Sequence, residues 1–156
     1  VVAKDGTLYA SEFSTCRVIA IAPDGLFRTI AGAGLGASIA AILNETARTE
    51  PDGPPREARL LMPMGLALDA QERLYLTEVG TRAAQALAGA TPEAMKAIPI
   101  YDGRIRMIDT DGKIKTVAGL GSGATGDAVR NPVGIVVTKD GKIVFVDNGT
   151  NQVKEL

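Results

Sequence analysis

The stretch RVIAIAPDGLFRTIAG, residues Arg17 to Gly32, returns in altered form as RIRMIDTDGKIKTVAG at Arg104 to Gly119. Each copy reads as a short apolar strand, an Asp-Gly turn, a second strand and the dipeptide Ala-Gly. The Asp-Gly pair suits a tight turn because glycine adopts a positive φ without steric cost. Because such self-similarity is the signature of a repeat architecture, the sequence predicts a fold built from recurring β-units.

Another recurring strand lies before these stretches and ends in an acidic residue. Its three versions are Leu8–Glu12, Leu74–Glu78 and Ile143–Asp147, and each follows a polar turn. A further apolar strand precedes that turn, and a Pro-x-Gly motif at Pro63 and at Pro132 introduces two of the copies. The repeat unit therefore contains four strands, and the chain holds two complete units and three strands of another.

Two insertions make the spacing between units uneven. Once the extra residues between Gly32 and Pro63 and between Glu78 and Asp111 are discounted, both intervals become roughly 48 residues. Four-stranded antiparallel units at about 40 to 50 residues are typical of β-propeller blades. We predict a first blade at 1–32, a linker insertion at 33–62, a second blade at 63–119 with an insertion at 83–103, and an incomplete third blade at 132–156.

The motifs of the unit resemble the NHL repeat. The shared pattern is Pro-x-Gly, an apolar strand, Asp-Gly, Leu-Tyr with an acid three residues later, a loop Arg, and a strand pair ending in Val-Ala-Gly. The segment from Asp52 to Asp69 is similar to the Gly-Asp-Gly-Gly-Pro-Ala linkers of bacterial NHL proteins. Two departures are the turn AQER at Ala70 and Gln152 in place of the loop Arg. The resemblance implies an all-β propeller of four-stranded antiparallel blades, with about three of roughly six blades in this chain.

Three blades do not close a propeller, which needs roughly four to eight. We expect the missing blades to belong to a longer chain, of which this is a segment, or to a second copy. NHL domains serve as protein-binding platforms, RNA-binding modules, sensor domains and, in a few relatives, enzymes. The resemblance to bacterial linker-type NHL proteins also implies a location outside the cytoplasm, in the periplasm or secreted.

Composition argues against several classes of function. With 17 Lys and Arg, 18 Asp and Glu and 4% aromatic residues, the chain lacks the basic, aromatic surface of a nucleic-acid binder. Its apolar runs are too short to span a bilayer, so we expect no membrane insertion. The sequence contains no histidine, which excludes a Ser-His-Asp triad, a Cys-His pair and an imidazole zinc site within these residues. Cys16 is the single cysteine and has no internal disulfide partner.

Four oxygen-bearing residues are candidate metal ligands. Glu12, Glu78 and Asp147 end equivalent strands, which places them on one rim, and Asn148 adds an amide oxygen. Carboxylate and amide oxygens are ligands for Ca²⁺. Such a set would resemble the axial site of calcium-dependent lactonase propellers, with the remaining ligands outside this segment.

The structural alternative is that each acid holds the loop that follows it. A carboxylate does so by accepting backbone N–H groups or by pairing with an arginine, as Glu12 with Arg17, or Glu78 with Arg82 or Arg104. Since an acid recurs in every blade, we favour this structural role. We expect no catalytic residues and no metal cofactor, with Ca²⁺ as the alternative.

The two insertions are the candidate binding surface. In an up-and-down blade, both would lie on the same face of the propeller. Apolar residues at helical spacing in the first, and a helix start at Thr91 in the second, predict a short helix in each. Their alternative role is to cover the rim of the propeller. We expect a protein or peptide partner to contact Leu35, Ile39, Ile42, Leu43, Thr91, Met95, Ile98 and Tyr101.

These observations favour a non-enzymatic platform that binds a protein or another ligand through loops on a rigid scaffold. A metal-dependent hydrolase or lactonase is the alternative. An RNA-binding module ranks third because aromatic and basic residues are scarce.

Overall fold

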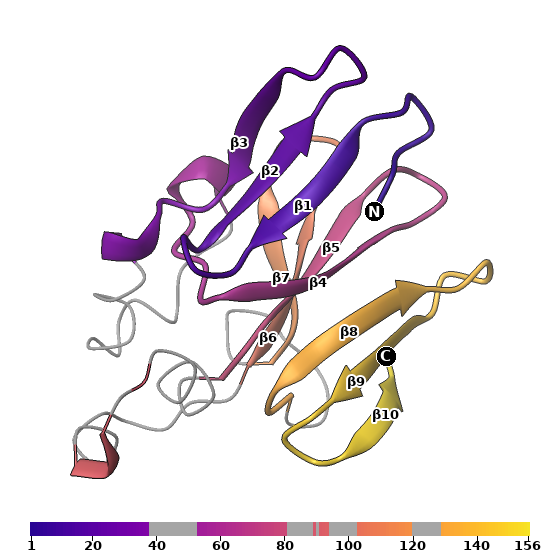
Figure 1. The fold of residues 1–156 in the computed structure, drawn as a ribbon. Coiled ribbons are helices and arrows are strands. Elements are labelled where there is room, and N and C mark those ends of the chain that lie inside the picture. The colour runs from indigo at the N-terminus through magenta and orange to yellow at the C-terminus, as the bar shows by residue number, and fades with distance from the viewer. Residues whose placement is uncertain (38–52, 81–88, 90, 94–102, 120–128) are drawn as a thin grey trace.

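The computed structural model describes residues 1–37, 53–80, 89, 91–93, 103–119 and 129–156. These residues form three antiparallel sheets that lie side by side, as Figure 1 shows. None of the three sheets closes on itself. Within the described segments, no helix has the length and apolar composition needed to cross a membrane. The predicted all-β class, built from consecutive antiparallel units, is confirmed.

The names first, second and third blade are used below for the three sheets, in chain order. The strands are β1 Leu8–Glu12, β2 Arg17–Ile21 and β3 Phe27–Ala31 in the first blade; β4 Pro63–Leu68, β5 Leu74–Glu78, β6 Arg104–Ile108 and β7 Ile114–Gly119 in the second; and β8 Pro132–Val137, β9 Ile143–Asp147 and β10 Gln152–Glu155 in the third.

The first blade has one strand fewer than predicted. The segment Val1 to Ala3 makes a single bridge, between Val2 and Leu8, instead of a full strand. This segment lies at the edge of its sheet, where it pairs with β1 on one side only, and the side chains of Val1 and Val2 are exposed. Because the segment hydrogen-bonds to a neighbouring strand on one side only and buries little surface, it has too few contacts to form a regular strand.

The Ala-Gly that ends each copy of the repeated stretch is explained by a close backbone approach. A side-chain carbon at Gly32 would overlap the carbonyl oxygen of Cys16, and one at Gly119 would overlap that of Gly103. Both glycines also have positive φ, 97° and 90°. Only glycine combines that backbone conformation with so little space. The repeated glycine therefore lets the last strand of a blade end against the start of the strand before it.

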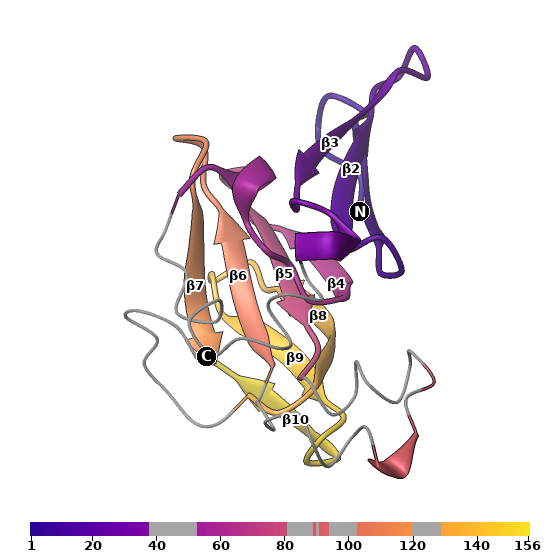
Figure 2. The same cartoon turned by 90° about the vertical axis from the view of Figure 1, so that its left-hand side faces the viewer.

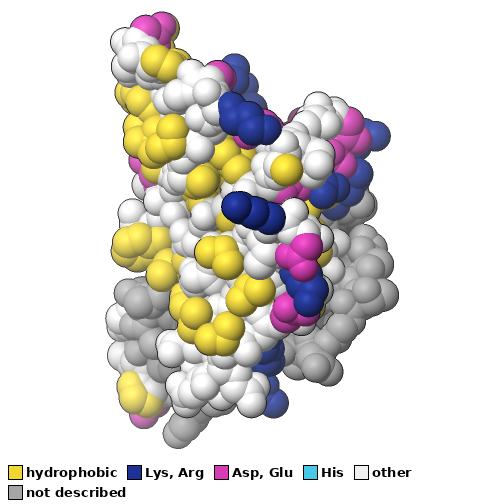
Figure 3. Space-filling model, turned by 90° about the vertical axis from the view of Figure 1, so that its right-hand side faces the viewer, with side chains coloured by type: hydrophobic (Ala, Val, Ile, Leu, Met, Phe, Trp, Pro, Cys, Tyr) yellow, Lys and Arg dark blue, Asp and Glu magenta, His cyan; other side chains and the backbone are white. Residues whose placement is uncertain are grey.

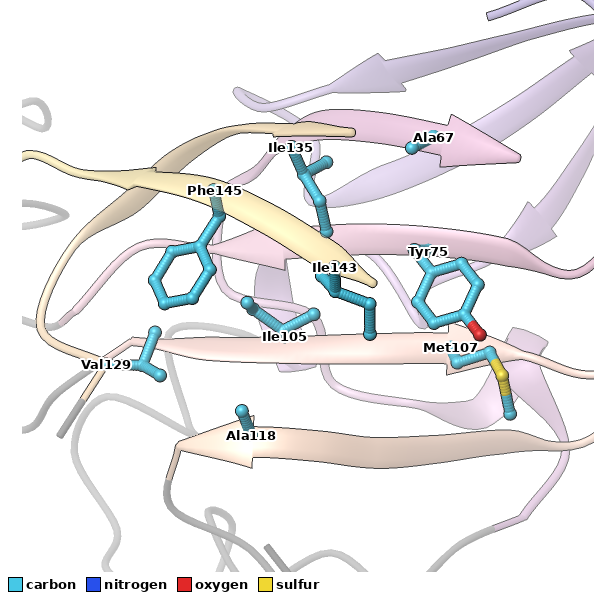
Figure 4. Close-up of a cluster of buried hydrophobic side chains, with 9 residues drawn as sticks. All are labelled: Ala67, Tyr75, Ile105, Met107, Ala118, Val129, Ile135, Ile143 and Phe145. Atoms are coloured by element: carbon cyan, nitrogen blue, oxygen red, sulfur yellow. The ribbon is translucent and has the colours of Figure 1, made fainter. Parts of the chain in front are cut away.

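The second blade is buried on both faces because a blade lies on each side of it (Figures 1 and 2). All five residues of β5 are buried. Leu74 and Leu76 join a cluster with Val18 of the first blade, whereas Tyr75 joins a cluster with Phe145 of the third. Figure 4 shows the second of these clusters, with side chains from the second and third blades pointing toward one another. Because successive side chains of a strand point to opposite faces of the sheet, β5 presents an apolar surface to both neighbouring blades.

A linker, 53–62, packs between the first and second blades. It contains the 3₁₀ helix η2 Pro55–Glu57. Gly53 exchanges two backbone hydrogen bonds with Ile114 of β7, and Pro55 accepts one from Gly32 at the end of the first blade. The side chain of Leu60 is fully buried in the cluster between the two blades. The linker is therefore part of the inter-blade core.

Candidate functional site

The carboxylate of Glu78 is buried between the linker and β6. Its Oε2 accepts a hydrogen bond from the backbone N–H of Leu61 at 2.7 Å and another from the Arg104 guanidinium at 2.8 Å. Nη1 of Arg106, also fully buried, lies 3.6 Å from Oε1. Glu78 thus connects the linker that enters the second blade to the third strand of that blade.

Asp147 repeats this arrangement in the third blade. Its Oδ1 accepts the N–H of Asn131 at 2.8 Å, and its Oδ2 accepts the N–H of Arg130 at 3.2 Å and the Lys154 ammonium at 2.8 Å. Burial raises the pKa of Asp147, but the hydrogen bonds from Lys154, Asn131 and Arg130 outweigh it and hold the pKa below its ordinary 3.8. The charged carboxylate is thereby stabilised as a structural connection.

Glu12, at the matching place in the first blade, is only partly buried. It pairs with Arg17 at 2.8 Å and accepts a hydrogen bond from the Thr15 hydroxyl at 3.1 Å. The ion pairs expected from the sequence, Glu12 with Arg17 and Glu78 with Arg104, are both present. Because it is partly exposed, the ion pair of Glu12 with Arg17 contributes little to stability. Because it is buried, loss of either partner from the pair of Glu78 with Arg104 would be strongly destabilising.

The four metal candidates do not form a metal site in the described structure. In that part of the chain, no three His, Cys, Asp or Glu residues come together as a metal-binding group. The carboxylates of Glu78 and Asp147 are next to N–H donors and cationic side chains, where a metal ion would meet like charge. Asn148 is exposed, and its backbone N–H donates to the carbonyl of Asn131. The surroundings of Glu78 and Asp147 therefore do not fit a Ca²⁺ site.

Two of the predicted partner-binding residues can be placed. Leu35 is exposed in a helical turn at 35–37, and Thr91 is exposed directly before a helical turn at 92–93. The six others lie outside the described residues: Ile39, Ile42, Leu43, Met95, Ile98 and Tyr101.

The segments that precede and follow the insertions leave the sheets at the end where the strand-end acids lie. Gly32 donates its N–H to Pro55, and Gly103 donates its N–H to Arg130 at the start of the third blade. At the opposite end of the sheets, the four connections 22–26, 69–73, 109–113 and 138–142 are each five residues long. Among the described residues, the long connections therefore begin and finish at the end of the sheets where the strand-end acids lie.

Two hydroxyl groups that the sequence analysis missed connect neighbouring blades. The Ser11 hydroxyl donates to the carbonyl of Met64 at 2.6 Å, and the Thr77 hydroxyl donates to that of Val133 at 3.2 Å. Thr77 also accepts the N–H of Gly65 at 2.9 Å. The signal in the sequence is a hydroxyl directly before the strand-end acid, with its acceptor in the middle of the next Pro-x-Gly.

A polar cluster in the second blade is also structural. Asp69 accepts the N–H groups of Gln71 and Arg73, pairs with the Arg73 side chain, and accepts the Tyr75 hydroxyl at 3.4 Å. Burial raises the pKa of Asp69, but the hydrogen bonds from Arg73 outweigh it and the pKa is lowered. Burial raises the pKa of Tyr75. The carboxylate thus closes the turn between β4 and β5 and fixes the aromatic ring.

A hollow of about 410 Å³ lies beside the 22–26 turn of the first blade. It contains one charged side chain and no carboxylate, so it lacks a pair of groups for acid–base chemistry. Its lining residues are Thr7, Ala20, Ala22, Leu26, Phe27 and Arg28.

Comparison with solved structures identifies the fold as a β-propeller. A protein of unknown function from Bacteroides thetaiotaomicron matches 97% of the chain with a TM-score of 0.64 and 20% identity. A putative gluconolactonase matches 99% with a TM-score of 0.63 and 15% identity. An auxiliary nutrient binding protein from Bacteroides thetaiotaomicron matches 99% with a TM-score of 0.58 and 16% identity.

The chain spans only part of these structures, covering 32%, 42% and 35% of their respective lengths. No protein-family model matches the sequence, and no curated protein does. The propeller fold is therefore shown, while the assignment of its blades to the NHL type stays a prediction.

Proposed function

We propose that this chain is part of an NHL-type β-propeller that binds a protein or peptide partner on the end of the sheets from which the insertions leave. The observation that carries the proposal is the asymmetry of the connections. Every connection at one end is five residues long, whereas the chain leaves the other end for the long segments 32–62 and 79–103. Loops on a rigid β scaffold are the usual place for recognition surfaces.

The contacts of the strand-end acids support a binding role over a catalytic one. Glu78 and Asp147 accept backbone N–H groups of the segments that enter their blades, and each pairs with a cation. Both carboxylates therefore hold the segment that enters a blade to the strands of that blade. The hydroxyls of Ser11 and Thr77 are used in contacts between blades.

The fold by itself is compatible with both kinds of function. Its structural neighbours include a putative gluconolactonase and a nutrient binding protein. One scaffold therefore accommodates catalysis and binding, and the site decides between them. The second candidate, a metal-dependent hydrolase or lactonase, rests on the first of these likenesses and requires ligands other than the acids described above.

A random-peptide display library is a direct probe of the binding role. Peptides selected on the wild-type chain are tested against a variant that lacks residues 83–102, with residue 82 joined to Gly103 by a short turn. Gly103 is kept because its N–H donates to Arg130 at 2.8 Å. We expect peptide affinity to fall at least tenfold, or about 1.4 kcal/mol.

The matched control changes the opposite end of the sheets. Lys113→Glu with Lys139→Glu alters two exposed turn residues there and should leave peptide affinity unchanged. Peptides that bind the deletion variant as tightly as the wild type would contradict the proposal. Hydrolysis of a lactone panel that requires added Ca²⁺ would favour the second candidate instead.

A further inference from the structure

The neighbouring residues Asn148 and Gly149 are both exposed in the turn between β9 and β10. The chain contains four asparagines, and Asn148 is the only one that a glycine follows. Asn44 precedes a glutamate and Asn151 a glutamine, whereas Asn131 precedes a proline, which has no N–H. Asn148 therefore differs from the other asparagines in the backbone group next to its side-chain amide.

The side-chain amide of an asparagine is open to attack by the backbone nitrogen of the following residue. Here that nitrogen belongs to Gly149, and the absence of a side chain leaves its approach to the Asn148 amide unhindered. Its N–H donates to Oδ1 of Asp147 at 3.2 Å, so a carboxylate lies beside the proton that the nitrogen must lose. Because the Asn148 side chain is exposed, water can reach it and ammonia can leave.

Packing requires the glycine of this pair but not the asparagine. A side-chain carbon at Gly149 would lie 2.6 Å from Cβ of Arg130, in the segment that enters the third blade. Asn148 stands where the other two blades have Phe13 and Val79, so the position does not depend on an amide. The reactive combination therefore arises where the structure fixes the second residue and leaves the first one free to vary.

The turn that contains this pair also holds the segment that enters the third blade. The N–H of Asn148 donates to the carbonyl of Asn131 at 2.9 Å. The neighbouring Asp147 accepts the N–H groups of Arg130 and Asn131. Thr150 closes the turn by donating its N–H to the carbonyl of Asp147 at 3.1 Å. A change in the backbone at Asn148 therefore reaches the contacts that fix the start of the blade.

We propose that Asn148 deamidates in the folded chain and that the product loosens the attachment of the entering segment to the third blade. The nitrogen of Gly149 loses its proton to solvent and forms a bond to Cγ of Asn148. The Cγ–Nδ2 bond breaks, and the departing nitrogen takes up a proton and leaves as ammonia. Water then opens the succinimide ring. Opening at the side-chain carbonyl gives aspartate, and opening at the main-chain carbonyl gives isoaspartate, whose backbone is longer by one carbon.

The two products act on this turn in different ways. Aspartate adds a negative charge next to the buried carboxylate of Asp147, which disfavours the charged form of that carboxylate. Isoaspartate carries the same charge and also lengthens the backbone, which moves Gly149 away from its place against Arg130. Charged side chains of both signs already lie close together on the surface, as Figure 3 shows for one side, so we expect the effect at this turn only. The modification is independent of what the loop end binds.

Mass spectrometry of the folded 156-residue chain, incubated at mildly alkaline pH and body temperature, tests the proposal. Trypsin releases residues 143–154 as one peptide, so a single spectrum compares Asn148 with Asn151. We expect a mass increase of about 1 Da at Asn148. It should form at least about tenfold faster there than at Asn151, where a side chain on the next residue hinders the attack. A protein isoaspartyl methyltransferase should label the incubated wild type but not Asn148→Gln, the matched control with a longer side chain.

The rates at the two asparagines decide whether the reaction belongs to the folded turn. Equal rates at Asn148 and Asn151 would overturn the proposal. An amide at Asn148 that survives in the folded chain while the urea-unfolded chain deamidates would overturn it as well. So would a rate that rises in the destabilised Glu78→Gln variant, because the reaction would then occur in the unfolded chain.

Thermal unfolding measures the effect of the modification on the third blade. The incubated wild type should melt below the fresh protein, Asn148→Asp should melt between the two, and incubated Asn148→Gln should be unchanged. A fully modified protein that melts like the fresh one would overturn the loosening. Asn148→Asp that melts as low as the modified protein would overturn the role assigned to the lengthened backbone.

Discussion

At the scale of single residues, glycine carries the clearest structural requirement. Gly112 and Gly119 both have positive φ, but a side-chain carbon at Gly112 would meet nothing within 4 Å, whereas one at Gly119 would overlap the backbone of Gly103. Both glycines recur in the two copies of the repeated stretch, so the sequence alone does not distinguish their roles. The turn glycine could be explained from the Asp-Gly pair alone, but the strand-end glycine needed the position of the neighbouring strand.

These two glycines form a matched pair for mutation. Gly112→Ala should destabilise the chain by about 1 kcal/mol, because only the unfavourable backbone conformation contributes. Gly119→Ala should cost at least about 3 kcal/mol, because the backbones must also separate. Urea unfolding monitored by circular dichroism measures both. Equal losses of stability would show that the close approach at Gly119 does not exist.

Glu72 departs from the turn chemistry of the other blades. It has a φ of 63°, where the corresponding turns have Gly6 and Gly141. Its contacts with Lys4 are exposed and therefore contribute little. Glu72→Gly should stabilise the chain by about 1 kcal/mol by relieving the backbone, and Glu72→Ala should not. Thermal unfolding of the two variants distinguishes the backbone effect from loss of the charge.

Asp147 should make stability depend on pH. Its pKa in the folded chain lies below the ordinary 3.8, so the charged form is favoured by folding. That contribution is fully present above pH 3.8 and is lost as pH falls through the lower, folded value. The melting temperature of Asp147→Asn should therefore decline less steeply than that of the wild type below about pH 4. Parallel declines would contradict the structural role of this carboxylate.

At the scale of elements, strands and turns were predictable because their signals are local. Alternation, Asp-Gly and Pro-x-Gly placed ten strands correctly in the described structure. The edge segment at Val1 was overpredicted because its pattern is apolar but its sheet contacts are few. The linker was predicted only as an insertion, because the burial of Leu60 depends on two blades far apart in sequence.

Substitutions of the strand-end acids test how much their ion pairs contribute to stability. Glu78→Gln leaves Arg104 and Arg106 buried near a neutral amide, and should cost about 3 kcal/mol, as breaking buried ion pairs does. Glu12→Gln changes the same place in the first blade, where the pair is partly exposed, and should cost less than about 1 kcal/mol. Urea titrations of both variants provide the comparison. A smaller loss for Glu78→Gln than for Glu12→Gln would contradict the burial assigned here.

At the scale of the whole molecule, the order of the blades could be predicted from the repeat in the sequence. The role of the strand-end acids could be identified only from the structure. The sequence placed Glu12, Glu78 and Asp147 on one rim, a pattern equally compatible with Ca²⁺ ligands and with connections between elements. Only the positions of Leu61, Arg130 and Asn131 show that N–H groups of the entering segments donate to the carboxylates of Glu78 and Asp147. Partners and the number of blades in the complete ring depend on surfaces whose occupants no local pattern encodes.

The carboxylates of Glu78 and Asp147 hold the segments that enter their blades, and this structural role leaves no place for a metal ion. Calorimetric titration of the chain with Ca²⁺, paired with thermal unfolding with and without the ion, tests it most directly. We predict no stoichiometric binding, and a destabilised Glu78→Gln variant whose stability Ca²⁺ does not restore. Stoichiometric micromolar binding that raises the melting temperature, and that Glu78→Gln or Asp147→Asn abolishes, would contradict it.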